Sequence, residues 1–246
     1  MPRRLFDSYE GDMATPYDIV RLASVGSTQD EARQRLAATR NPTLVVADEQ
    51  IEGRGRQGRG WTSPDRAMFA SFSFVSEWEI ADRTLLPLIT AVAVRDAVQT
   101  HLGVEIGLRW PNDLMVDGAK VGGILVEMSN DDITVGCGLN LWWKTPMAGA
   151  RGLVISDPGD TIAFSLAEAW VGEFIASVQA GSSKWSREQY ETASVTLGRD
   201  VTWGGGAGRA VAIAPDGALV VERDGELIEL RAGEVHTLDG NELDGR

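Results

Sequence analysis

The stretch EGRGRQGRGW, residues 52–61, decides between two fold classes, because its glycines have the spacing of a dinucleotide-binding loop. In a dinucleotide-binding fold this loop opens a helix, whose N-terminus holds the pyrophosphate. The residues that follow here, RGWTSPDRAMFA, contain Trp61 and Pro64 and do not begin a helix. The next element has the pattern of a strand, so the βαβ unit is missing. We therefore reject the dinucleotide-binding interpretation.

Three arginines alternate with the glycines of this loop: Arg54, Arg56 and Arg59. Glycine lets the backbone approach a ligand closely, and guanidinium groups bind phosphate and carboxylate oxygens in a bidentate manner. The loop therefore suits a polyanion such as a nucleoside triphosphate. A solvated, flexible basic loop is the alternative interpretation, because most runs of charge are solvated.

The composition bounds the architecture and the partners. The chain has 246 residues, of which 43% are hydrophobic, enough for one large domain and a small one. Its formal net charge is -13 and its pI is about 4.6. Because an acidic chain repels nucleic acid, we expect no DNA binding.

Cysteine and histidine are too scarce for a disulfide or a zinc site. Cys137 is the only cysteine, and His101 and His236 lie far apart in the sequence. No internal disulfide can form, and such residues cannot supply four zinc ligands. We expect no metal site built from Cys or His. The G-x-S-x-G motif is also missing, which disfavours a serine hydrolase.

Targeting signals are not evident in the sequence. The N-terminal segment MPRRLFDSYEGD has two arginines but no apolar core, so we expect no signal peptide. No run approaches the roughly 18 apolar residues that span a bilayer, so we expect no membrane association. A cytoplasmic, reducing location fits best.

Apolar periodicity predicts helices and strands along most of the chain. Thr28 is a candidate helix N-cap, with Glu31 completing a capping box. Strands are expected at residues 43–50, in MFASFSFVSEW with one buried face, and in VEIGLRW, DLMVDG, KVGGILVEMS and DITVGCGLNL. Residues 85–102 predict a buried helix and TIAFSLAEAWVGEFIASV an amphipathic one. The pair Asp117–Gly118 marks a hairpin turn.

The pattern changes near Leu197. From there to Leu238, short β-branched runs alternate with glycine and turn signals, as in a small antiparallel barrel or meander. We therefore expect a large domain at residues 1–195 and a small β domain at residues 196–246.

A second group of polar residues lies in RWPNDLMVDGAKVGGILVE. Trp110 offers a stacking face, and Asn112 and Asp113 supply polar groups near a turn, although a capped β-turn explains the same residues. The two adjacent glycines weaken a strand unless something packs against its backbone. Lys120 can reach a ligand lying on these glycines. Asn140, in GCGLNL, needs hydrogen-bond partners if it is buried, which neighbouring backbone can also supply.

Together these segments resemble the biotin protein ligase family, because their motifs occur in that family's order. STQD corresponds to its Ser-Thr-Asn segment, DEQIEGRGRQGRGW to its biotin and adenylate loop, and RWPNDL to its Lys-Trp-Pro-Asn-Asp box; KVGGILVE and GCGLNL complete the set. The resemblance covers about residues 20–238. It implies an α+β fold with a central mixed or antiparallel sheet flanked by helices, similar to class II synthetases, and a C-terminal SH3-like β-barrel.

The resemblance also implies an activity, that of an ATP-dependent biotin protein ligase. In that family biotin and ATP give biotinyl-5'-adenylate and pyrophosphate. Biotin is then transferred to a lysine of a biotin carboxyl carrier domain, in acetyl-CoA carboxylase or a related carboxylase. The implied cofactors are ATP and the Mg²⁺ bound with it, and biotin is the substrate.

Residue by residue, the resemblance implies that Lys120 and Arg56 are catalytic. The implied biotin-binding residues are Ser27, Thr28, Gln29, Gln50, Gly53, Arg54, Gly55, Arg56, Trp61, Lys120, Gly122 and Gly123. The implied ATP-binding residues are Arg54, Arg59, Trp61, Arg109, Trp110, Asn112, Asp113 and Asn140.

Two residues depart from the family's motifs. Gln29 stands where Asn is usual, and Arg109 where Lys is usual; Arg and Lys are not equivalent at a phosphate site. About 20 residues precede the first motif, too few for the winged helix-turn-helix of some members, so we expect a ligase without DNA binding. A lipoate-type ligase and a non-catalytic module that binds biotin or its adenylate stay open as alternatives. A homodimer is compatible with the sequence, which does not locate an interface.

Overall fold

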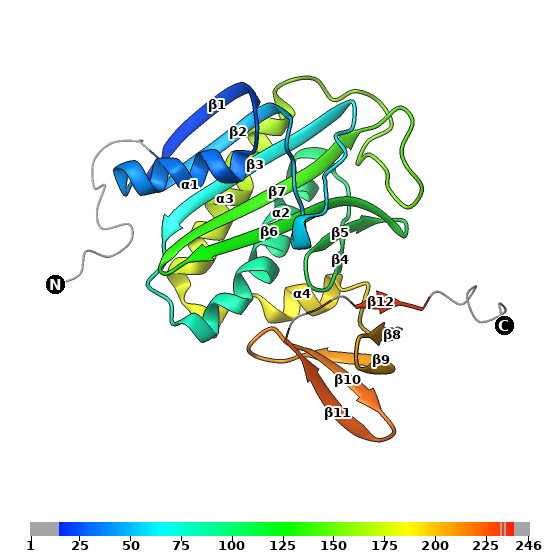
Figure 1. Cartoon of the computed structure of the whole chain (residues 1–246). Coiled ribbons are helices and arrows are strands. Elements are labelled where there is room, and N and C mark those ends of the chain that lie inside the picture. Colours follow the sequence, from blue (N-terminus) through cyan, green and yellow to red (C-terminus); the bar gives the residue numbers. More distant parts are fainter. Residues whose placement is uncertain (1–14, 232, 234, 239–246) are drawn as a thin grey trace.

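The structure, a computed structural model, describes residues 15–231, 233 and 235–238. It contains a large mixed sheet and a small antiparallel sheet that lies below it in Figure 1. The segment MPRRLFDSYEGD, for which we expect no signal peptide, lies outside the described residues.

The large sheet has seven strands in the order β1-β2-β3-β7-β6-β5-β4. Its strands are β1 (Asp18–Val25), β2 (Thr43–Gln50), β3 (Arg66–Val75), β4 (Gly107–Arg109), β5 (Asp113–Val116), β6 (Ala119–Ser129) and β7 (Asp132–Trp142). The first two strands pair in parallel, and the other neighbours pair antiparallel. The expected mixed sheet is thereby confirmed.

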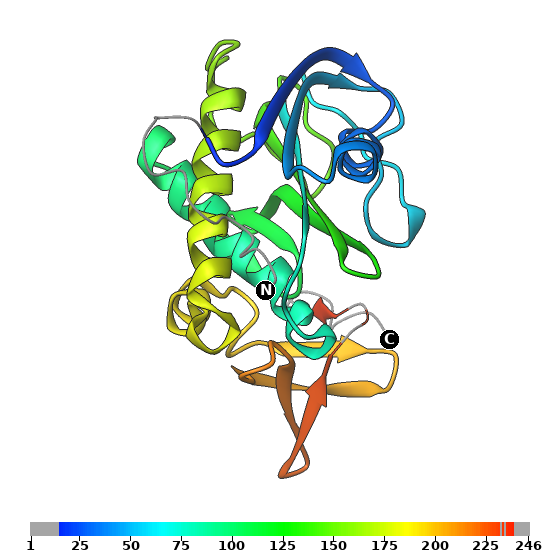
Figure 2. The same cartoon turned by 90° about the vertical axis from the view of Figure 1, so that its left-hand side faces the viewer.

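Helices cover both faces of this sheet, as Figures 1 and 2 show. One face packs against α2 and α3, and the other carries α1. The helices are α1 (Thr28–Thr39), α2 (Leu86–Leu102), α3 (Ile162–Ala180) and α4 (Arg187–Ala193), with 3₁₀ turns η1 (Arg56–Gly58), η2 (Ile80–Leu85) and η3 (Ser182–Lys184). Among the helices of the described residues, none is long and apolar enough to cross a membrane.

The start of α1 differs from the sequence-based prediction. Ser27 is the N-cap and its side chain makes no capping hydrogen bond, so the predicted capping box of Thr28 and Glu31 is wrong. The backbone N–H and the hydroxyl of Thr28 instead donate to Gln50 Oε1, at 2.9 and 3.0 Å. A helix N–H that has no partner within the helix is thus satisfied by a side chain at the end of β2.

Strand β3 is buried on both faces, which corrects the predicted single buried face. Every residue between its two ends is buried. On the α1 side, Ser73 Oγ donates to the carbonyl of Ala32 at 2.7 Å. On the other side, Phe72 and Phe74 pack against Phe174 of α3, with ring centroids 6.3 and 5.7 Å apart. The alternation of small polar and aromatic residues therefore separates two packed faces rather than core from solvent.

The C-terminal sheet has five antiparallel strands in the order β11-β10-β9-β8-β12. They are β8 (Asp200–Trp203), β9 (Gly206–Ile213), β10 (Leu219–Arg223), β11 (Glu226–Leu230) and β12 (His236–Thr237). The expected small β unit is confirmed. Within the described residues, β11 and β12 are its two edges and do not pair with each other, so the sheet is open there rather than closed into a barrel.

Trp110 joins the two sheets. Its backbone N–H donates to Thr196 Oγ1 at 2.9 Å, and its indole N–H donates to the carbonyl of Gly217 at 3.0 Å. The side chain is only 3% exposed. The C-terminal sheet is therefore fixed directly beside the segment that carries Asn112 and Asp113.

Gly122 occupies a position in β6 that leaves no room for a side chain. A Cβ there would lie 2.7 Å from the carbonyl oxygen of Gly138 and 2.6 Å from Leu139 Cδ2. We expect Gly122→Ala to lower the free energy of unfolding by about 1–3 kcal/mol through overpacking. The control is Gly172→Ala in α3, where a Cβ would meet nothing within 4 Å. It should raise stability by about 0.5–1 kcal/mol. Urea unfolding measures both, and similar effects of the two variants would contradict this packing.

Candidate active site

A pocket with a cavity volume of about 230 Å³ opens on the α1 face of the large sheet. The start of α1, the 52–61 loop, and parts of β3, β6 and β7 line it. The predicted site residues in its wall are Ser27, Thr28, Gln29, Gln50, Arg54, Gly55, Arg56, Arg59, Trp61, Asn112, Asp113, Lys120 and Gly123. Most of the site residues that we predicted from separate motifs thus line one cavity.

Five of the predicted residues are not part of this wall: Gly53, Arg109, Trp110, Gly122 and Asn140. Arg109 does not line the pocket but donates to the carboxylate of Asp113, which does. Trp110 lies at the junction with the C-terminal sheet. Asn140 is 3% exposed and lies farther along β7 than the glycines of the pocket. A ligand role stays a prediction for these five residues, as it does for the residues of the wall.

The floor of the pocket is backbone rather than side chain. Gly123 of β6 pairs with Gly138 of β7, and the indole of Trp61 lies on both. A Cβ on Gly138 would lie 3.1 Å from the Trp61 ring, and one on Gly123 would lie 3.4 Å from it. The sequence-based expectation that something packs against the glycines of this strand is therefore confirmed. Lys120 Nζ would lie 3.5 Å from the same Gly123 Cβ, so the lysine reaches over this floor.

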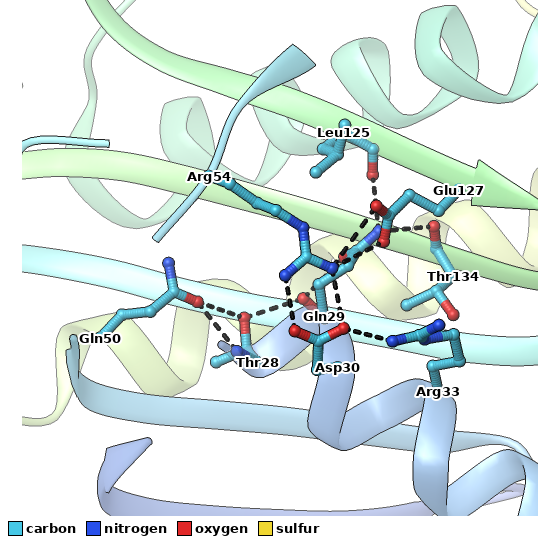
Figure 3. Close-up of polar contacts among 10 residues, drawn as sticks. Thr28, Gln29, Asp30, Arg33, Gln50, Arg54, Leu125, Glu127 and Thr134 are labelled. Atoms are coloured by element: carbon cyan, nitrogen blue, oxygen red, sulfur yellow. Dashed lines mark hydrogen bonds and ion pairs between the residues drawn. The ribbon is translucent and has the colours of Figure 1, made fainter. Parts of the chain in front are cut away.

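One end of the pocket is a chain of polar contacts, shown in part in Figure 3. Thr28 Oγ1 lies 3.0 Å from Gln50 Oε1 and 2.9 Å from Ser71 Oγ, and Ser71 Oγ lies 3.0 Å from Gln29 Oε1. Two hydroxyl hydrogens serve these three contacts between oxygens. One contact therefore has no hydrogen between its two oxygens, so the oxygens at this end of the pocket keep acceptor capacity for a donor from a ligand.

Gln29 fits its position because residue 136 is a glycine. Its Nε2 donates to the carbonyl of Thr134 at 3.0 Å and, more weakly, to that of Leu125 at 3.4 Å. A Cβ on Gly136 would lie 2.4 Å from Gln29 Oε1. The glycine thus makes space for an amide one methylene longer than the Asn that is usual in the resembled family.

The other end of the pocket is charged and built around Asp113. Its carboxylate accepts from Lys120 Nζ at 2.6 Å and from Arg109 Nη2 at 2.7 Å. Burial alone would raise the pKa of Asp113, but the ion pair with Lys120 and the contact with Arg109 outweigh it and lower that pKa. Asp113 is therefore ionised at neutral pH and holds Lys120 in place.

The 52–61 loop is a narrow hairpin. The N–H of Trp61 donates to the carbonyl of Gly53 at 2.9 Å, and the N–H of Gly55 donates to that of Arg59 at 2.7 Å. From this hairpin, the side chain of Arg56 donates to Asn112 Oδ1 at 2.9 Å and to the carbonyl of Gly233 at 3.3 Å. The loop therefore reaches across the sheet towards both the Asn112 segment and the C-terminal unit.

Thiolate chemistry has no support in this pocket, although Cys137 borders it. Its side chain is buried, and burial raises the pKa of the thiol, so it stays protonated at neutral pH. In the part of the chain that the structure describes, no group of three His, Cys, Asp or Glu residues could hold a metal ion.

Several residues of the site escaped the sequence analysis. Ser71, Gly136 and Gly138 line the pocket, and Asp30 and Glu127 bind Arg54 at its rim. A signal existed for the glycines, because GCG places two of them on one face of a strand. Asp30 and Glu127 lie in the segments STQD and KVGGILVE, but no local pattern gave their carboxylates a role.

Solved structures share this fold. A biotin protein ligase from Aquifex aeolicus in complex with biotin and ATP matches with a TM-score of 0.73 and 24% identity, over 89% of this chain and 98% of that chain. A mutant of that ligase in complex with biotin matches with a TM-score of 0.74 and 25% identity, over 91% and 99%. The sheet with its glycine floor and covering loop thus places the protein in the class of biotin-protein-ligase folds.

Sequence comparisons agree with this class. Residues 21–140, just under half of the chain, match the model of the Biotin/lipoate A/B protein ligase family. A bifunctional ligase/repressor BirA from Bacillus spizizenii is 34% identical over 125 residues, which are 48% of this chain and 38% of that protein. A biotin–[acetyl-CoA-carboxylase] ligase from Mycobacterium tuberculosis is 35% identical over 127 residues, 49% of this chain and 48% of that protein. The chain thus spans less than half the length of these two relatives.

The ionisation of Asp113 gives a pH-dependent prediction. Because its pKa is lowered by folding, the charged carboxylate stabilises the fold above about pH 4, and this contribution is lost as the pH falls through the lowered folded value. Asp113→Asn lacks the contribution. The difference in free energy of unfolding between wild type and variant should be largest near pH 6 and shrink below about pH 4. Denaturant unfolding across this range measures it, and a constant difference would contradict the assignment.

Proposed function

We propose that the protein is an ATP-dependent biotin protein ligase, which forms biotinyl-5'-adenylate and transfers biotin to a lysine of a biotin carboxyl carrier domain. One observation carries the proposal: a single pocket joins a polar end that accepts hydrogen bonds, a glycine floor, and a charged end with Lys120. The names of the relatives and the complexes with biotin and ATP support the same activity.

The polar end suits the ureido head of biotin. A ureido group offers two N–H donors and one carbonyl acceptor. The contacts among Thr28, Gln50, Ser71 and Gln29 contain more acceptor oxygens than donor hydrogens, so an N–H of the ligand would find an acceptor here. The backbone N–H and hydroxyl of Thr28 already fix the orientation of the Gln50 side chain. We therefore place the biotin head between the start of α1 and β3.

The charged end suits the first chemical step. A carboxylate oxygen of biotin attacks the α-phosphorus of ATP, and the bond to pyrophosphate breaks. Two anions must approach each other, so positive groups must neutralise charge that is largest in the transition state. Lys120 reaches over Gly123 and is a compact point charge suited to the reacting oxygens. Arg56, held by Asn112, can bridge several oxygens of the adenylate.

The nucleotide is expected on the side of Asn112, Asp113 and Asn140. Within the described residues, Trp61 Nε1 and Asn140 Oδ1 are buried without hydrogen-bond partners. A buried donor and a buried acceptor without partners are costly unless a ligand supplies them. An adenylate carries both kinds of group. Magnesium would neutralise the leaving pyrophosphate, with the phosphates of ATP as its main ligands.

In the second step, a neutral lysine amine of the carrier attacks the acyl carbon, AMP leaves, and the amine loses a proton. The adenylate is prone to hydrolysis, so a loop that covers it protects it from water. The 52–61 hairpin already lies over the glycine floor through Trp61. Its glycines allow it to move, and its arginines give it a ligand to close on.

The arrangement of the rest of the chain forms part of the proposal. We propose a ligase domain at residues 1–195 and an SH3-like domain from residue 196 onward, in a protein of the cytoplasm. The separate antiparallel sheet that begins at Asp200 supports the division into two domains, and the free, buried Cys137 fits a reducing compartment. The homodimer stays a prediction from the sequence, which a mass measurement in solution would test.

The direct test is biotin-dependent exchange of labelled pyrophosphate into ATP, followed by labelling of a carrier domain. We expect both with the purified protein, and Lys120→Ala should lower the rate constant of adenylation by about 100-fold or more. Lys184→Ala, on the exposed turn η3, should leave both unchanged. No biotin-dependent exchange and no labelling would overturn the proposal.

Arg56→Gly should separate adenylation from retention of the intermediate. If Arg56 holds the adenylate, the variant should still form biotinyl-adenylate but release it and label bystander proteins. Arg209→Gly, an exposed position in β9, is the matched control. Mass spectrometry of labelled lysines measures the effect, and retention at the wild-type level would argue against this role.

Two alternatives are separated by simple measurements. A lipoate-type ligase would be stabilised by lipoate rather than biotin in a thermal-shift assay. A non-catalytic module would bind biotin and release no pyrophosphate, which the position of Lys120 over the glycine floor disfavours.

A further inference from the structure

The first arginine of the loop, Arg54, is held by two carboxylates from distant parts of the chain (Figure 3). Its guanidinium contacts Asp30 with both terminal nitrogens, at 2.5 and 2.8 Å, and Nη2 lies 3.3 Å from Glu127 Oε2. Asp30 is in the first turn of α1, and Glu127 is in β6. One side chain thus ties the loop to two elements that both line the pocket.

The charges of this cluster cancel. Arg33 also binds Asp30 Oδ1, so two arginines face two carboxylates. The contact with Arg54 lowers the pKa of Asp30 in spite of partial burial, and the contact with Asp30 raises that of Arg54. An anionic ligand at Arg54 would meet Asp30 and Glu127 as well. Arg54 is therefore a poor counter-charge for a carboxylate or a phosphate, although it borders the pocket.

The position of Arg54 in the hairpin shows which part of the loop its contacts with Asp30 and Glu127 hold. Hydrogen bonds pair Gly53 with Trp61 and Gly55 with Arg59, so the hairpin is held together internally. A hairpin of this kind moves as a unit about its base. Arg54 lies at that base, one residue from the Gly53–Trp61 pair, so its ion pairs attach the base of the hairpin to α1 and β6.

We propose that Asp30 and Glu127 are positioning residues that hold the loop closed over the pocket through Arg54. This inference rests on the proposed function for what the pocket binds. The three side chains are 30–36% exposed. Solvent therefore weakens the ion pairs, which makes them reversible and lets the loop open for ligand exchange. Arg54 holds the base of the loop, and Arg56 faces Asn112 farther along the hairpin.

The test compares Asp30→Asn and Glu127→Gln, which remove a charge at nearly constant shape, with Arg33→Ala as the control. Arg33→Ala keeps both partners of Arg54 and removes the other arginine on Asp30. Loop opening is measured without any ligand, as the rate of tryptic cleavage after Arg56 and Arg59, with the sites identified by mass spectrometry. The Michaelis constant for biotin and kcat come from pyrophosphate exchange.

Both carboxylate variants should raise the cleavage rate in the loop at least threefold over Arg33→Ala. They should raise the KM for biotin by about threefold to tenfold and change kcat less than twofold, because the charge-assisted contacts are lost while the reacting groups remain. Asp30→Glu should restore slow cleavage at least in part. Higher salt should speed cleavage of the wild type more than that of the two variants.

Wild-type cleavage rates in both variants, or cleavage that rises equally throughout the chain, would overturn the proposal. A fall in kcat with an unchanged KM would do the same, because it would place Arg54 at the reacting oxygens. The proteolysis needs no activity: fast cleavage in a protein that adenylates nothing would refute the proposed function and leave the positioning role standing.

Discussion

The pocket depends on one close contact, that of the Trp61 indole with the backbone of two paired glycines. Gly123 and Gly138 face each other on neighbouring strands, and a Cβ on either would lie within 3.4 Å of the ring. Side chains at these positions would push the tryptophan, and the hairpin that it ends, away from the sheet. The loop, Lys120 and the polar end of the cavity are brought together because this part of the sheet is bare backbone.

The sequence predicted the parts of the site that obey local rules. No helix follows the glycine-rich loop, and the adjacent Gly122 and Gly123 predicted a partner packed on the backbone of their strand; both hold in the structure. It did not reveal the partners of Arg54, because Asp30 and Glu127 are 24 and 73 residues away in the chain. It also misplaced the helix cap, since Gln50 of the next strand satisfies the Thr28 N–H. Local propensity does not register a partner supplied by tertiary structure.

The C-terminal sheet is coupled to the pocket by short-range contacts rather than by a linker. Trp110 donates to Thr196 and Gly217, and the next polar residue, Asn112, binds Arg56 of the loop. Arg56 also reaches the carbonyl of Gly233. The segment between β4 and β5 therefore contacts both the C-terminal unit and the hairpin. A displacement of the C-terminal unit would thus shift the contacts that Asn112 makes with the loop.

The proposed function requires an acidic protein to keep cations available for anions without leaving them unpaired. Asp113 meets both needs, because it binds Lys120 and Arg109 at once. If Lys120 turned towards the oxygens of a ligand, Asp113 would keep Arg109 as a partner, so this half-buried carboxylate would not be left uncompensated. Arg54 has the opposite arrangement, one cation between two carboxylates, and gains little by turning towards an anion. Lys120 shares its carboxylate with a second cation and is therefore suited to act on a ligand. Arg54 is shared by two carboxylates and is therefore suited to hold a loop.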